Sequence, residues 1–165
     1  MALALDASAD ADSVPFSVSV TISTTTTNCL LLLFVNNNGG VPGTPSDVAG
    51  LTWTRFASVN AGDHDQWLEL WWAVAAAVLT GDVITVTQPN SATIGATVLA
   101  VSGADTSSPF DGAGGSTASV GVAMSITTTV ADTFITASYR NFLDTMTAGA
   151  GFTGISSSGF SMTEY

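Results

Sequence analysis

Basic residues are nearly absent from this 165-residue chain. It contains two Arg and no Lys against thirteen Asp and Glu, which gives a formal net charge of −11. A surface of that charge repels the phosphates of nucleic acids and the anionic headgroups of membranes. The composition therefore predicts no nucleic-acid partner and no membrane partner.

Cysteine, histidine and long apolar runs are also scarce. Cys29 is the single cysteine, so no disulfide can form within the chain, and its apolar neighbours predict a buried thiol. No apolar run approaches the ~18 residues of a membrane-spanning helix. The first residues lack the basic and apolar regions of a secretory signal, which favours a protein that works without export.

The residues that are abundant favour strands and turns. Hydrophobic residues make up 46% of the chain and charged residues 9%, with many Thr, Ser, Val, Ala and Gly. β-branched residues fit strands, and Gly fits turns. The sequence predicts an all-β protein with one domain over residues 15–165, preceded by a flexible acidic arm over residues 1–14.

The run WLELWWAV at 67–74 is the centre of the predicted fold. Read with a period of two, Leu68, Leu70, Trp72 and Val74 form one apolar face, which we expect to face the core. The other face carries Trp67, Glu69, Trp71 and Ala73, more apolar surface than a strand turned to water usually shows. We predict a central strand covered on both faces, by this chain or by a neighbour; a helix is the alternative, because residues 73–79 are rich in helix formers.

The rest of the chain reads as further short strands separated by loops. Strands are predicted at 15–22, 29–35, 51–57, 83–87, 92–101, 120–128, 133–139 and 159–165, and loops at 39–50, 60–65, 102–116 and 141–158. Eight or nine strands at this spacing are typical of an antiparallel β-sandwich of jelly-roll or Ig-like type. The predicted core comprises Leu32, Phe34, Trp53, Leu70, Trp72, Val86, Val98 and Val101.

The order of several motifs resembles a β-sandwich module of bacterial and phage proteins, many of them unassigned surface or virion structural proteins. The motifs are LLLFV at 31–35, GLTWT at 50–54, LWWAVA at 70–75, TVT at 85–87, SGADTSSPFD at 102–111 and GFSMTEY at 159–165. The resemblance covers about residues 28–165 and carries no catalytic signature. Similar modules usually continue with further strands beyond the last motif, whereas this sequence stops at Tyr165.

Candidates for chemistry are few. His64, the single histidine, lies between Asp63 and Asp65, where a solvated hairpin loop is the simpler interpretation than a metal ligand. Asp105 and Asp111 could bind Ca²⁺, but turn-forming carboxylates explain them more simply. Glycines 112, 114 and 115 have no Lys and no helix signal after them, so we expect no phosphate site. We predict no catalytic residue, no metal and no cofactor.

The resemblance and the missing catalytic set together imply a structural role. We expect a non-enzymatic virion protein of a phage, either a capsid-decorating (cement) or a fibre-type subunit. Its expected partners are copies of itself, a major capsid protein, or both. The alternative is a carbohydrate-binding or adhesin module, with Trp rings as a stacking platform, or a subunit of an extracellular filament. The expected subunit interface comprises Trp67, Trp71, Phe160, Met162 and Tyr165.

The segment 159–165 gives a further reason to expect partner chains. If the closing strands of the module are missing, its sheet has an edge with unpaired N–H and C=O groups beside apolar core. We expect a partner to cover that edge, by strand addition or with its acidic amino-terminal arm.

Overall fold

The computed structural model describes residues 2–13, 15–60, 66–111, 128, 133–140, 147–158 and 161–165. This part is all-β and antiparallel, and contains eleven strands rather than eight or nine. In the described residues there is no helix able to cross a membrane. The strands are β1 (Ala4–Ser13), β2 (Ser17–Ile22), β3 (Cys29–Asn37), β4 (Ser46–Asp47), β5 (Thr54–Asn60), β6 (Trp67–Ala75), β7 (Asp82–Thr87), β8 (Ile94–Ser102), β9 (Ala137–Arg140), β10 (Gly154–Ser158) and β11 (Ser161–Glu164).

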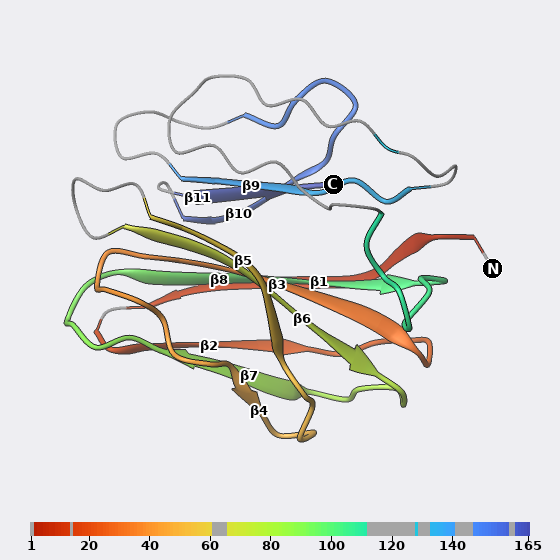
Figure 1. Cartoon of the computed structure of the whole chain (residues 1–165), viewed down its shortest axis with the longest axis horizontal. Coiled ribbons are helices and arrows are strands. Elements are labelled where there is room, and N and C mark those ends of the chain that lie inside the picture. Colours follow the sequence, from red (N-terminus) through yellow and green to blue (C-terminus); the bar gives the residue numbers. More distant parts are fainter. Residues whose placement is uncertain are drawn as a thin grey trace.

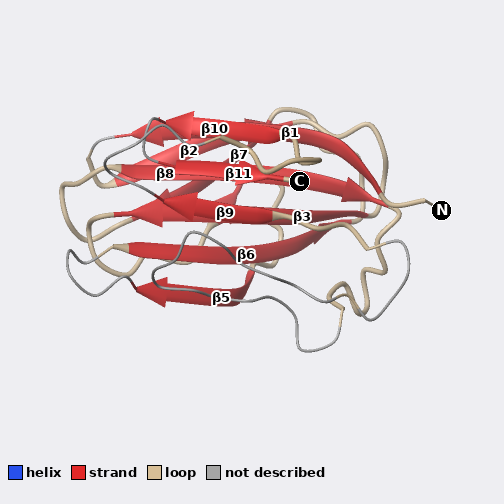
Figure 2. Ribbon diagram, turned by 90° about the horizontal axis from the view of Figure 1, so that it is seen from above, coloured by secondary structure: helices blue, strands red, loops and turns tan. Residues whose placement is uncertain are grey.

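The strands form three stacked sheets (Figure 1). The central sheet has the order β1-β8-β3-β6-β5, and it lies between a small sheet, β2-β7-β4, and a C-terminal sheet, β10-β11-β9. Seen from above, the C-terminal strands run along the strands of the central sheet beneath them (Figure 2). The prediction of an antiparallel sandwich is confirmed, and its central layer is buried on both faces.

β3 shows why the central layer forms. All nine residues of β3 are buried, as a continuous apolar run predicts for a strand covered on both faces. Leu31, Leu33 and Val35 point to the small sheet and build the main core with β2 and β7. The alternate residues, Leu30, Leu32 and Phe34, build a second core under the C-terminal sheet.

The predicted core residues divide between these two cores. Trp53, Val86 and Val98 belong to the main core. Leu32, Phe34, Leu70, Trp72 and Val101 belong to the second. The expectation of one core was therefore too simple.

β6 is a strand, and both of its faces are covered by this chain itself. Glu69, Trp71, Ala73 and Ala75 are buried towards the main core, while the opposite face with Leu70 and Trp72 is half-buried. Leu70 and Trp72 face a core as expected, the second one, although the face with Glu69 and Trp71 is the more deeply buried of the two. The helix alternative is wrong, because Ala73 and Ala75 continue the strand, and residues 76–81 form no helix.

The predicted acidic arm is, in its described part, strand β1. It pairs with β8 from Ala4 opposite Ser102 to Ser13 opposite Ile94. A bulge leaves Asp6 without a register partner, so that Ala7, Ala9 and Ala11 pack on the main core whereas Leu3 and Leu5 pack on the second core. The sequence gives this strand little periodic apolar signal, because its side chains on the main core are alanines.

The C-terminal segment also differs from its prediction. β11 lies between β10 and β9 and pairs with both, so it is not an uncovered edge. β10 comes from the stretch expected to be loop. The edge argument for a partner chain is therefore wrong. The predicted strand at 120–128 lies outside the described residues except for Thr128.

Candidate functional site

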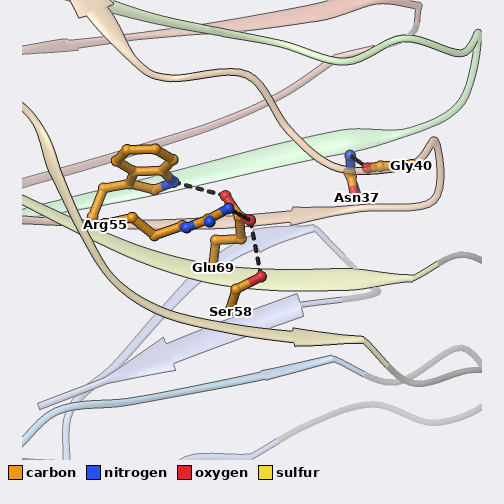
Figure 3. Close-up of polar contacts among 6 residues, drawn as sticks. Asn37, Gly40, Arg55, Ser58 and Glu69 are labelled. Carbon is orange, nitrogen blue, oxygen red and sulfur yellow. Dashed lines mark hydrogen bonds and ion pairs between the residues drawn. The ribbon is translucent and has the colours of Figure 1, made fainter.

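Glu69 is a charged residue that is buried inside the central sheet. Its carboxylate is fully buried (0% exposed) and accepts hydrogen bonds from Arg55 Nη1 at 3.1 Å, Ser58 Oγ at 2.9 Å and Trp71 Nε1 at 2.8 Å. These contacts are drawn in Figure 3. The Arg55 guanidinium also lies 5.7 Å from the centre of the Trp71 ring. We call Arg55, Ser58, Glu69 and Trp71 the Glu69 cluster.

A bulge in β5 makes this cluster possible. Arg55 pairs with Trp71 and Ser58 with Glu69, and the register shifts between Arg55 and Ala57. In a regular strand, side chains three apart point to opposite faces, and the bulge brings Arg55 and Ser58 to the same face. Phe56, at the bulge, stacks on Phe110 with ring centres 4.0 Å apart.

The cluster ties strands together. A buried carboxylate must find donors to replace the water it loses, and Glu69 has three from β5 and β6. Arg55 keeps 47% of its side chain exposed, so the ion pair reaches solvent only through the cation. Both carboxylate oxygens are already engaged, which is the arrangement of a structural acceptor.

Two other carboxylates act in the same way. Asp47 accepts from Leu51 N at 3.0 Å and from Trp53 Nε1 at 2.7 Å, fixing the loop between β4 and β5. Glu164 accepts from the Tyr139 hydroxyl at 2.8 Å and from Gly149 N at 2.7 Å. Burial, followed by the bond to Glu164, raises the pKa of Tyr139 to about 12.

A group of amides closes one end of the sandwich. Asn37 Nδ2 donates to Gly40 O at 2.7 Å (Figure 3), and Gln88 Nε2 donates to Ala92 O. The side-chain oxygens of Asn37, Asn38 and Gln88 are buried without a hydrogen-bond partner. The Asn37 and Gln88 amides each fix their own loop, after β3 or after β7, and the backbone bond from Asn38 N to Thr93 O at 3.2 Å joins the two loops.

Of the residues considered as metal ligands, some are described by the structure and others are not. Asp105 Oδ1 accepts from Ser107 N at 2.9 Å, Ser107 Oγ at 2.6 Å and Ser108 N at 3.4 Å, and the Ser107 bonds lower the pKa of Asp105. These bonds are those of a turn-forming carboxylate. Asp63, His64 and Asp65, and glycines 112, 114 and 115, lie outside the described residues. Over the described ranges, no three His, Cys, Asp or Glu side chains come together as metal ligands.

The predicted interface residues lie in different surroundings. Trp71 (6% exposed) and Met162 (7% exposed) are covered by this chain, so they need no second subunit to bury them. Trp67 is half-buried, and Tyr165 packs on the second core and stacks on Phe134. Phe160 lies outside the described residues. The subunit contact itself stays a prediction.

Trp71 and Trp53 also offer no open ring face for a sugar, because both are buried in the main core. The sequence shows the carboxylate between two tryptophans but does not indicate its partners, Arg55 and Ser58. The available signal was an Arg in the neighbouring strand. The bulge that aims Arg55 at Glu69 has no recognisable pattern in the sequence.

Searches of protein-family models, curated proteins and solved structures found no match to this chain.

Proposed function

We propose that this chain is a non-enzymatic structural protein of a phage virion, a capsid-decorating or fibre-type subunit. In this role it contacts copies of itself, a major capsid protein, or both. The observation that carries the structural role is the use of the carboxylates inside the fold. The buried Glu69 and Glu164 and the half-buried Asp47 each accept two or more donors that cross-link strands or fix loops, while the buried Asp82 accepts from Ala49 N at 2.9 Å through one oxygen. These hydrogen bonds engage groups that an acid–base catalyst would need free.

The packing supports the same role. The central sheet is enclosed between two other sheets, so its apolar residues fill two cores of one small unit. A unit fixed on both faces keeps its shape when it is loaded in an assembly. Fixed shape is what repeated contacts in a particle require.

The assignment to a phage rests on the motif resemblance. The motifs LLLFV, LWWAVA and TVT fall on β3, β6 and β7, and SGADTSSPFD falls on the loop after β8. The described part of GFSMTEY falls on β11, and GLTWT lies mostly in the loop before β5. The acidic surface keeps the subunit away from the packaged nucleic acid, which fits a place on the outside of a particle.

Particle composition tests the proposal. Virions from an induced culture of a strain that carries the gene are banded by density, and the band is examined by mass spectrometry. We expect the chain in the band at a fixed ratio to the major capsid protein, which serves as the internal control. If the chain is abundant in the cells and absent from the band, the virion role is wrong.

A further inference from the structure

The connection from β1 to β2 contains a strained residue. Phe16 has a φ of 71°, in the left-handed region that bulky residues avoid. Its backbone is held there because its carbonyl accepts from Gln88 N at 2.8 Å, while Ser17 N donates to Pro15 O at 3.0 Å. The Phe16 side chain is 52% exposed, so packing of the ring compensates little of this strain. The turn is imposed by its surroundings, since β1 and β2 belong to different sheets.

The strand that precedes this turn is β1. In the described part of the central sheet it pairs with β8 alone and forms an edge. Its inward side chains on the main core are Ala7, Ala9 and Ala11, which bury little area. β1 is therefore held by its ladder to β8, by Asp6 and by Leu5 on the second core.

Asp6 is a specific attachment point. Its carboxylate accepts from Thr25 N at 2.7 Å, Thr25 Oγ1 at 2.6 Å and Thr26 Oγ1 at 3.1 Å. The bulge at Asp6 sets this attachment in register with the β8 ladder. A β1 strand from another copy of this chain would reproduce both sets of contacts, whereas an unrelated peptide would lack the bulge and the carboxylate.

We propose that two copies of this chain exchange β1, each placing its residues 4–13 beside β8 of the other. In the exchanged dimer the backbone at Pro15 and Phe16 is extended, so Phe16 returns to a negative φ in both copies. The Ser17 N–Pro15 O bond is lost, while the ladder to β8 and the contacts of Asp6 are kept. Short, strained connections favour such exchange, and reciprocal exchange closes into a two-fold dimer. Pro15 supports the extended form because the residue before a proline prefers extended backbone. The exchange goes beyond the virion role, and purified protein tests it whether or not that role holds.

Disulfide trapping between two different chains tests the exchange. Two variants are made in a Cys29→Ala background, one with Asp10→Cys on β1 and one with Thr97→Cys on β8. These two positions are register partners. The variants are unfolded in urea, mixed, refolded together at high concentration and oxidised. We expect a covalent dimer with one chain of each kind on non-reducing gels, because the thiols meet only when β1 of one chain lies beside β8 of another.

Two controls make the outcome decisive. A single chain with both substitutions shows whether this pair can form a disulfide at all. Phe16→Gly, which removes the left-handed strain, should lower the yield of mixed dimer roughly fivefold or more. If the double variant closes its disulfide as a monomer and the mixed variants give no dimer above the Asp10→Cys protein alone, the exchange is wrong.

If the double variant forms no disulfide, light scattering on size-separated protein decides. Wild-type chain refolded at high concentration should contain a dimer fraction that falls in Phe16→Gly. Wild-type protein that is entirely monomeric under these conditions overturns the proposal.

Discussion

The Trp71 indole N–H is one of three donors that replace water around the buried Glu69 carboxylate. Trp71→Phe keeps most of the ring and removes this donor, so we expect a loss of about 1–3 kcal/mol in the free energy of unfolding. Trp72→Phe is the matched control, since Trp72 is half-buried on the opposite face of the same strand. Urea unfolding measures both. Equal losses in the two variants would contradict the role given to the Glu69–Trp71 bond.

Asp6 and Asp10, both on β1, should respond to acid in opposite directions. Hydrogen bonds from Thr25 lower the folded pKa of Asp6 below its ordinary 3.8, so its stabilisation is present above that value and is lost as the pH falls through the lowered pKa. Partial desolvation of its carboxyl group raises the folded pKa of Asp10, so its ionised form opposes folding at neutral pH. We expect Asp6→Asn to destabilise and Asp10→Asn to stabilise at pH 7.

Urea midpoints measured from pH 7 down to pH 2 check this pair of variants. Both differences from wild type should shrink in acid, where both carboxylates are protonated in either state. A difference for Asp6→Asn that is independent of pH would show that its hydrogen bonds do not depend on the charge.

The Tyr139 hydroxyl gives a test at the alkaline end. Its folded pKa of about 12 lies above the ordinary 10, so the neutral phenol stabilises the folded state below pH 10, and this stabilisation is lost as the pH rises towards 12. The phenolate absorbance of the folded protein should contain a step near pH 12 that Tyr139→Phe removes. A wild-type curve identical to that of the variant over this range would contradict the Tyr139–Glu164 bond.

At the scale of the element, the β5 bulge is what aims Arg55 and Ser58 at Glu69. Deleting Phe56 leaves Arg55 and Ser58 two residues apart, so in a regular strand both side chains still face Glu69. We expect this deletion to cost only the stacking on Phe110, about 1–2 kcal/mol in the free energy of unfolding, as Phe56→Ala does while keeping the bulge. Urea unfolding compares the two variants. A deletion that is far more harmful than Phe56→Ala would mean that the bulge itself, and not only the shared face, is needed for the cluster.

Sequence patterns identified the strands whose side chains are large and apolar. β3, β6, β7 and β8 were predicted within a few residues, because runs such as LLLFV and WLELWW have few other stable positions in a small protein. β1 and β10 were missed, since Ala, Ser, Gly and Asp carry little periodic signal. The Glu69 cluster needs a one-residue irregularity in β5, which depends on the pairing of the whole sheet and is not encoded in a local pattern.

At the scale of the whole molecule, two cores share one central sheet. Removing the sheet that covers one core should expose that core and leave the other intact. A chain truncated after Asp111 keeps the strands of the main core and loses the C-terminal sheet. Leu30, Leu32 and Phe34 then face water, and we expect increased binding of a hydrophobic dye together with retained strand content in circular dichroism. A truncated chain that binds no more dye than the full chain would show that the second core does not depend on that sheet.

The pairing of β1 with β8 also has a consequence for the order of events during synthesis. Ala4 lies opposite Ser102, 98 positions later in the chain. At about 5–20 residues per second, the ribosome completes β8 roughly 5–20 s after β1 has been made. Throughout that interval β1 has no β8 of its own chain to pair with, although β8 of a neighbouring chain translated earlier from the same message is already complete. Translation thus sets a period in which the two possible partners of β1 are available in sequence, the neighbour's first and its own second.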